Sequence, residues 1–152
     1  MIYSNEASIQ TGLTNHRLVE SPIRFKARPQ PGVKPLRVLV VDDDTAIRLV
    51  LVEMWAALGC HAEGARNGLE ALERFSEGEF DLILTDLNMP VMDGFGLTRR
   101  VRNSSTEIKI VVMTGLCPDE VEEMMSADRV DAWLFKPFGM REIRRLHQRF
   151  QP

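Results

Sequence analysis

Short apolar segments and helical patterns alternate along the chain from Leu36 onward. Five segments have the length of strands, and the nearly continuous apolar run at 36–41 is typical of a strand buried on both faces. The predicted strands span residues 36–41, 61–65, 80–85, 108–113 and 130–135. Apolar positions spaced three and four residues apart predict a helix after each strand. The predicted helices span residues 45–58, 69–75, 95–101, 118–127 and 139–150.

The helix after the first strand has the clearest apolar spacing. Either Asp44 or Thr45 can cap its N-terminus, because short oxygen-bearing side chains accept hydrogen bonds from the N–H groups of the first turn. Gly59 fits the end of the helix. The pattern therefore indicates an amphipathic helix. The apolar residues that share one face are Ile47, Val50, Leu51, Met54 and Leu58.

Strict alternation of strands and helices predicts an α/β fold, with a parallel sheet covered by helices on both faces. Right-handed crossovers leave few topologies for such a sheet. Five strands and five helices in a segment of this length fit the flavodoxin-like, doubly wound order 2-1-3-4-5. In sheets of this kind, functional sites form beyond the carboxyl ends of the strands. The residues that follow each strand are therefore the first candidates for chemistry.

Residues 1–35 differ in composition from the rest of the chain. They hold four of the eight prolines, and five Lys and Arg against two Asp and Glu, so the segment is net +3 in a chain that is net −3. Prolines disfavour helix and favour extended backbone. We therefore predict a disordered or extended basic arm over 1–35 and one folded domain over 36–150. A partner-docking role for the arm, and a translation start near Val33, stay open as alternatives.

The overall composition is that of an ordinary globular domain, with 44% apolar and 27% charged residues. The net negative charge argues against strong nucleic-acid binding by the whole chain. The sequence has no apolar run long enough to span a membrane and no secretion signal at its start, so we expect a cytoplasmic protein. Cys60 and Cys117 make no disulfide framework, and the three histidines lack zinc-ligand spacing.

Polar groups follow four of the five predicted strands. Asp42 and Asp43 come after the first strand and Asp86 after the third. Thr114 follows the fourth strand and Lys136 the fifth. Each residue alone has an ordinary explanation as a cap or a solvated group. Because the predicted order makes these four strands neighbours, we expect the groups to gather at one edge of the sheet.

The gathered groups favour metal-assisted phosphoryl chemistry. Crowded carboxylates raise one another's pKa unless a cation lies among them. Hard oxygen ligands select Mg²⁺, with Mn²⁺ as an alternative, over zinc. An ammonium and a hydroxyl would neutralise further oxygens of a transferring phosphoryl group. A carboxylate can be the attacking nucleophile and form an aspartyl phosphate.

The sequence resembles the receiver domain of two-component response regulators, most closely the single-domain chemotaxis type. The resemblance covers residues 36–150, and its motifs include every acceptor-site residue of the family. The motifs Asp81–Gly94 and Trp133–Phe138 together are highly specific for this family. The matching motifs are Val40–Asp43, Asp81–Gly94, Val111–Gly115 and Trp133–Phe138.

The resemblance implies a role for each group at the strand ends. Asp86 would be the phosphorylated residue. Asp42 and Asp43 would position the metal, with Asp86 and the backbone carbonyl of Asn88 as further ligands. Lys136 would pair first with the acceptor carboxylate and then with the phosphoryl group.

The resemblance also implies a switch. The Thr114 hydroxyl would be drawn towards the phosphoryl oxygens. Trp133 lies at the position of the family's aromatic switch. Alternatively, Trp133 only covers part of the edge of the core. Pro137 would follow Lys136 through a cis peptide bond. Leu116, two residues after Thr114, has no polar atom with which to orient a water, so we predict slow self-dephosphorylation.

Partners follow from the same resemblance. A sensor histidine kinase or phosphotransfer protein would supply the phosphoryl group, and an unknown downstream protein would bind the face formed by residues 118–127, 130–135 and 139–150. Because no helix-turn-helix segment follows residue 150, direct DNA binding is not expected unless the chain is a fragment. We expect a monomer, with dimerisation on phosphorylation through opposite charges on this face as an alternative. The protein would be a signalling phosphoacceptor rather than a turnover enzyme.

Two other functions compete with this interpretation. A metal-dependent phosphohydrolase would place its nucleophile after the first strand, where Asp42 and Asp44 have the right spacing, but it would leave residues 86–94 unexplained. A flavin- or nucleotide-binding module would need a glycine-rich phosphate loop after that strand. Residues 42–46 are acidic there and contain no glycine.

Overall fold

The computed structural model describes residues 32–125 and 129–151, so the predicted arm over residues 1–35 lies almost entirely outside the described part. Strands and helices alternate as predicted. The strands are β1 (Arg37–Val41), β2 (His61–Ala65), β3 (Leu82–Asp86), β4 (Lys109–Thr114) and β5 (Ala132–Phe135). The helices are α1 (Thr45–Ala57), α2 (Gly68–Glu77), α3 (Gly94–Ser104), α4 (Pro118–Met125) and α5 (Met140–Phe150).

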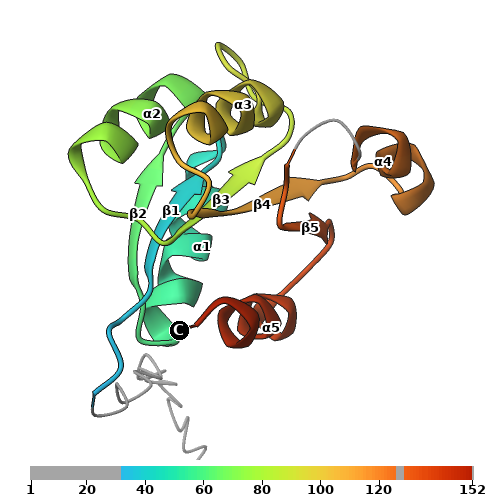
Figure 1. Ribbon diagram of the computed structural model, residues 1–152. Coiled ribbons are helices and arrows are strands. Elements are labelled where there is room, and N and C mark those ends of the chain that lie inside the picture. The colour runs from blue at the N-terminus through green and yellow to red at the C-terminus, as the bar shows by residue number, and fades with distance from the viewer. Residues whose placement is uncertain (1–31, 126–128, 152) are drawn as a thin grey trace, which may run out of the picture.

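The described strands form one parallel sheet in the order β2-β1-β3-β4-β5, as the alternation predicts (Figure 1). Because every strand runs the same way, all the carboxyl ends lie at one edge. Asp86 at the end of β3 is in register with Met113 of β4, and Thr114 with Phe135 of β5. This register brings the residues that follow β3, β4 and β5 to neighbouring positions.

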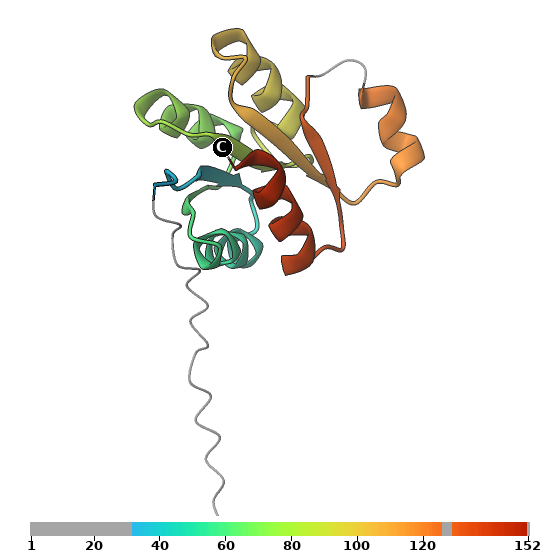
Figure 2. The ribbon, with the colours of Figure 1, turned by 60° about the horizontal axis from the view of Figure 1, so that its bottom comes forward.

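Two apolar cores lie on opposite faces of the sheet, because alternate residues of each strand point to opposite sides. One core packs strand residues such as Val40 and Leu84 against Leu51 of α1 and Ile143 of α5. The other core packs the alternate strand residues, such as Leu39 and Ile83, against α2 and α3. Figure 2 shows α1 and α5 on one side of the sheet and α2 and α3 on the other.

β3 and β5 each begin two residues later than the pattern predicts. At both places an aspartate accepts a backbone hydrogen bond from the neighbouring strand. The N–H of Arg37 donates to Asp81 Oδ2 at 2.8 Å, and the N–H of Ile110 donates to Asp131 Oδ2 at 2.8 Å. Aspartate side chains thus satisfy backbone N–H groups near the amino-terminal ends of β1 and β4.

The buried face of α1 is narrower than its apolar stripe. Leu51 and Trp55 are buried at 2% and 0% exposure, whereas Ile47 is 39% exposed and Val50 is 54% exposed. Asp44 is the cap, since its Oδ1 accepts from the N–H groups of Ala46 and Ile47 at 2.8 and 3.1 Å. The stripe therefore continues beyond the core onto the surface. No helix of the described residues is long and apolar enough to cross a membrane.

Candidate functional site

The carboxyl ends of the strands bring together the predicted polar groups. Asp42 after β1, Asp86 at the end of β3 and Thr114 at the end of β4 are all buried, with 2%, 8% and 1% exposure. Lys136 follows β5, and its Nζ lies 2.6 Å from Asp86 Oδ1. Buried polar groups require partners or a function. The edge of the sheet is therefore a polar site beside two apolar cores.

Both carboxylate oxygens of Asp86 are engaged. Oδ1 accepts from Lys136, and Oδ2 accepts from the backbone N–H of Asn88 at 3.1 Å. The peptide bond between Lys136 and Pro137 is cis, as the resemblance implies. The contacts with Lys136 and Asn88 fix the orientation of the Asp86 carboxylate and place the Lys136 ammonium next to it.

The loop after β3 passes very close to Asp86. A Cβ atom at Gly94 would lie 2.5 Å from the backbone oxygen of Asp86, closer than real Cβ atoms come to other atoms. The N–H of Gly94 donates to the carbonyl of Leu87 at 2.9 Å. Position 94 therefore requires glycine, and this requirement places the start of α3 against Asp86.

Asp42 is held by its neighbours but keeps one oxygen without a partner. Its N–H donates to the carbonyl of Ala65 at 3.1 Å, and its Oδ1 accepts from the N–H of Asp44 at 2.9 Å. Its Oδ2 is buried with no hydrogen-bond partner. Burial raises the pKa of this carboxyl, and the charges of Asp86 and Asp43 raise it further, against the lowering effects of the Asp44 N–H and Lys136. A buried oxygen of this kind fits a cation.

The residues present fit a hard divalent ion. No group of three or more His, Cys, Asp or Glu side chains in the described parts of the chain makes a ready metal site by itself. Mg²⁺ does not need one, because it keeps several waters and uses one or two carboxylates together with phosphate oxygens. The charge of Asp86 raises the pKa of Asp42, and Asp43 next to it in the chain is exposed. The carbonyl of Asn88 stays a predicted ligand.

The switch candidates lie on the other side of Asp86. The Thr114 hydroxyl accepts from the N–H of Leu116 at 3.0 Å. The carbonyl of Thr114 accepts from the N–H of Lys136 at 2.7 Å, which joins the ends of β4 and β5. Trp133 is half-buried and meets Phe95 of α3 edge to face, with ring centroids 6.0 Å apart. Trp133 therefore contacts α3, whose first residue, Gly94, lies against Asp86.

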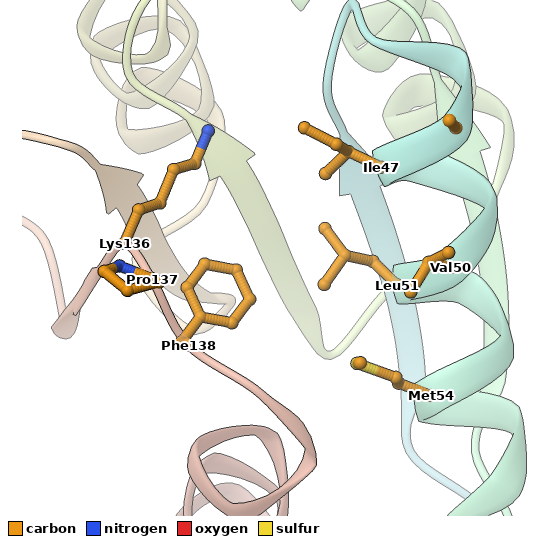
Figure 3. Close-up of a pocket in the computed structure, with 8 residues that line it drawn as sticks. Ile47, Val50, Leu51, Met54, Lys136, Pro137 and Phe138 are labelled. Atoms are coloured by element: carbon orange, nitrogen blue, oxygen red, sulfur yellow. The ribbon is translucent and has the colours of Figure 1, made fainter.

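An apolar groove next to the site was not predicted from the sequence. It has a volume of about 380 Å³ and runs between α1 and the segment after β5. Figure 3 shows Ile47, Leu51 and Met54 facing Phe138 across it. Lys136 also lines the groove, so the groove is continuous with the polar site. The apolar stripe of α1 was the sequence signal, but the pattern alone did not show that part of it stays exposed.

Arg48 of α1 is a second residue that sequence reasoning missed. Its Nη1 donates to the backbone carbonyl of Asp42 at 2.6 Å. An arginine within an amphipathic helix is normally expected in solvent. No sequence signal would have distinguished it from other surface arginines.

The comparisons with known proteins agree with the geometry. Residues 38–148 match the family model described as the response regulator receiver domain. The chain is 36% identical over 107 residues to "Response regulator receiver protein CpdR" of Brucella abortus, which covers 70% of this chain and 89% of that protein. It is 34% identical over 125 residues to "Sensor protein EvgS" of Escherichia coli, covering 78% of this chain but 10% of that protein. The chain therefore spans only a small part of some relatives.

Solved structures show the same fold. The chemotaxis response regulator CheY4 of Vibrio cholerae superposes with a TM-score of 0.72 at 32% identity, covering 77% of this chain and 99% of that chain. The receiver domain of the sensor histidine kinase PA1611 from Pseudomonas aeruginosa superposes with a TM-score of 0.68 at 26% identity, covering 77% of this chain and 98% of that one. That structure has a magnesium ion coordinated in the active-site cleft.

Proposed function

Because the chain belongs to the response regulator receiver domain family, we propose that it accepts a phosphoryl group on Asp86 from a phosphohistidine of a sensor kinase or phosphotransfer protein. The observation that carries the proposal is the contact of 2.6 Å between Lys136 and Asp86, next to the unpartnered buried oxygen of Asp42. This arrangement offers a nucleophile, an ammonium and a vacant oxygen ligand in one place. A two-component phosphorelay uses such a set.

The transfer step follows from the contacts. An oxygen of Asp86 forms a bond to phosphorus as the phosphorus–nitrogen bond of the donor breaks, and the imidazole leaves with the electron pair. Lys136 balances the charge of the acceptor before transfer and of the phosphoryl oxygens afterwards. Mg²⁺, held by Asp42, Asp43 and Asp86 with Mn²⁺ as the alternative, would supply charge neutralisation during transfer. The backbone N–H of Asn88 keeps the carboxylate oriented.

The output would pass through Thr114 and Trp133. A phosphoryl group adds about two negative charges. The Thr114 hydroxyl would turn from the N–H of Leu116 to a phosphoryl oxygen, and this turn would alter the contact between Trp133 and Phe95. The face of α4, β5 and α5 would then bind a downstream protein or a second copy. No DNA contact by this domain is proposed.

The protein would act as a phosphoacceptor rather than as a turnover enzyme. Leu116 packs against the core on the α2–α3 side and has no polar atom to direct a water at the phosphoryl group. Self-dephosphorylation is therefore expected to be slow compared with that of a Leu116→Glu variant. Asp44, the second acid of the alternative phosphohydrolase arrangement, instead caps α1 through its Oδ1.

The groove beside Lys136 gives the phosphodonor a place to dock. A donor must bring its phosphohistidine to Asp86, and the surface next to this site is apolar, with Val50 and Leu49 at 54% and 60% exposure. Exposed apolar surface next to a polar site is typical of an interface. The donor domain would therefore present apolar residues, most simply on a helix, beside its phosphohistidine.

One experiment tests the acceptor chemistry without a partner. The protein is incubated with Mg²⁺ and acetyl phosphate, and intact mass is followed together with tryptophan fluorescence. The expected result is a gain of one phosphoryl group that is absent in Asp86→Asn and in the presence of a chelator. No gain in the wild-type protein would overturn the proposal.

A second experiment separates docking from chemistry. Val50→Asp should slow transfer from the partner phosphotransfer protein at least about tenfold, because it places a charge in an apolar interface. The same variant should react normally with acetyl phosphate, which needs no docking surface. Leu69→Asp on α2, at a residue that is 42% exposed in the wild type, is the matched control and should leave both reactions unchanged. Normal transfer to Val50→Asp would remove the groove from the proposal.

A further inference from the structure

Asp42 is anchored from three different elements of the fold. Its N–H donates to Ala65 at the end of β2, and its Oδ1 accepts from Asp44 in the turn before α1. The third anchor comes from α1, where Arg48 Nη1 donates to the Asp42 carbonyl at 2.6 Å. Asp42 follows Val41, the last residue of β1 in register with both neighbouring strands. The first two anchors hold the N–H and one carboxylate oxygen, and Arg48 holds the carbonyl.

From this arrangement we propose that Arg48 is a positioning residue for the metal site. The hydrogen bond from its guanidinium to the carbonyl of Asp42 fixes this residue, so that its free Oδ2 remains oriented towards the cation. The inference deepens the proposed function, because it concerns the same Mg²⁺. Partners that orient a metal ligand typically change metal affinity by about 10- to 100-fold when they are removed. Arg48 acts through Asp42 and is not itself a ligand.

The side chain of Arg48 passes close to Gly64. A Cβ atom at Gly64 of β2 would lie 3.1 Å from both Cγ and Cδ of Arg48, tighter than most real Cβ contacts. The aliphatic part of the side chain therefore crosses the edge strand where that strand has no side chain. Arg48 Nη2 also donates to the Thr45 hydroxyl at 3.2 Å. The glycine and the two acceptors together define where the guanidinium lies.

A charge-based role for Arg48 would predict the opposite result. If its positive charge mainly repelled the metal, removing that charge would strengthen Mg²⁺ binding. If the guanidinium positions Asp42, the same change weakens binding, because a charge-assisted hydrogen bond that fixes the ligand is lost. The sign of the change in affinity thus distinguishes positioning from repulsion.

The test measures the dissociation constant of Mg²⁺ alone by calorimetry on the full chain. Arg48→Met keeps much of the aliphatic side chain and removes the donors, and it should bind Mg²⁺ about tenfold more weakly. Gly64→Val keeps the arginine but displaces it, and it should show a similar loss. In the double variant the second change should add little, because both act through the same clamp. Arg100→Met on α3 and His61→Val on β2 are the controls for loss of charge and for a new valine.

A second readout separates positioning from damage to the fold. At saturating Mg²⁺, labelling of Asp86 by acetyl phosphate in Arg48→Met should return to within about twofold of the wild-type rate, since ground-state binding alone is weakened. Unchanged or tighter Mg²⁺ binding in folded Arg48→Met would overturn the inference and leave the proposed function intact. Failure of the wild-type protein to bind Mg²⁺ would overturn both.

Discussion

The two sides of Asp86 differ in how firmly their polar groups are held. On the β1 side, Asp42 has hydrogen bonds at its N–H, its carbonyl and one carboxylate oxygen. On the β4–β5 side, the Thr114 hydroxyl accepts from the N–H of Leu116, and Trp133 rests half-buried on an edge contact with Phe95. Ion binding requires oxygens set in advance, whereas signalling requires groups that can change partners. Under the proposed function, the β1 side would be the fixed half that binds the metal, and the β4–β5 side would be the movable half that passes on the signal.

The largest effect is expected from Asp42→Asn on the fixed side. Mg²⁺ affinity should fall by about 100-fold, because the charged ligand is lost. Without metal, the variant should be more stable than the wild type by about 1 kcal/mol, since it removes a buried charge. Calorimetry measures the first quantity, and urea unfolding in the presence of a chelator measures the second.

The pH dependence of that gain in stability has a defined sign. The pKa of Asp42 is raised in the folded state from its ordinary value of 3.8, so the ionised form costs stability at neutral pH. The cost disappears when both states are protonated, below pH 3.8. The advantage of Asp42→Asn should therefore be largest near pH 7 and shrink towards pH 4. An advantage that grows on acidification would contradict the assigned burial cost. Asp43→Asn removes only a neighbouring charge and leaves the buried carboxylate of Asp42 in place, so its gain should be much smaller.

Gly94→Ala should damage both sides at once. The new Cβ would meet the backbone of Asp86 at 2.5 Å, so the loop must move. We expect a loss of about 1–3 kcal/mol in unfolding free energy and slower labelling by acetyl phosphate. Gly115→Ala, where nothing lies within 4 Å of a Cβ, is the control and should behave like the wild type. Equal behaviour of the two variants would show that the loop adapts freely.

Thr114→Val should act on the movable side alone. The valine has the same shape but offers no oxygen to the N–H of Leu116, so a loss of about 1 kcal/mol in stability is expected. Mg²⁺ binding and labelling of Asp86 should persist, while the response of Trp133 fluorescence to phosphorylation should vanish. Trp55, buried in the opposite core, gives a constant background. Thr98→Val removes a comparable hydrogen bond in α3 and should keep the fluorescence response.

The smallest effect is expected at Val91, in the loop between β3 and α3. Val91 has φ of 73°, in the left-handed region that a β-branched residue rarely adopts, and it is 73% exposed. Val91→Asn should stabilise the protein by up to about 1 kcal/mol, because asparagine tolerates this conformation. Leu49→Asn removes a similarly exposed apolar side chain without relieving strain and should bring no gain.

The sequence predicted the fold, and the gathering of polar groups at one edge of the sheet, because both depend on order along the chain. Alternating segments define the parallel sheet, and the residues after each strand must then lie at one edge. Strand order placed Asp86 and Lys136 at the same edge, whereas their pairing was implied by the resemblance to the receiver family. The helical period placed the apolar residues of α1 on one face, but it could not show how much of that face would be buried. Ile47 and Val50 fit the helical period as well as Leu51 does, yet they remain exposed.

The pattern of apolar and polar positions could not predict hydrogen bonds between side chains and the backbone. The clamp from Arg48 to Asp42 depends on the path of a long side chain across β2 and on the missing side chain at Gly64. The use of Asp81 as an acceptor for the N–H of Arg37 depends on the register of β1 and β3. Such features follow from three-dimensional placement rather than from spacing. They became visible only once strand register and helix position were known.

The pairing of Lys136 with Asp86 also bears on how the protein folds. The two residues are 50 positions apart, and β4 lies between their strands in the sheet. The contact therefore cannot form until β3, β4 and β5 have all assembled in register. Contacts this distant in sequence are slow to form, because the chain must first close a long loop. Under the proposed function, competence to accept a phosphoryl group should thus appear late in refolding, and labelling of Asp86 would then serve as a kinetic marker for completion of the sheet.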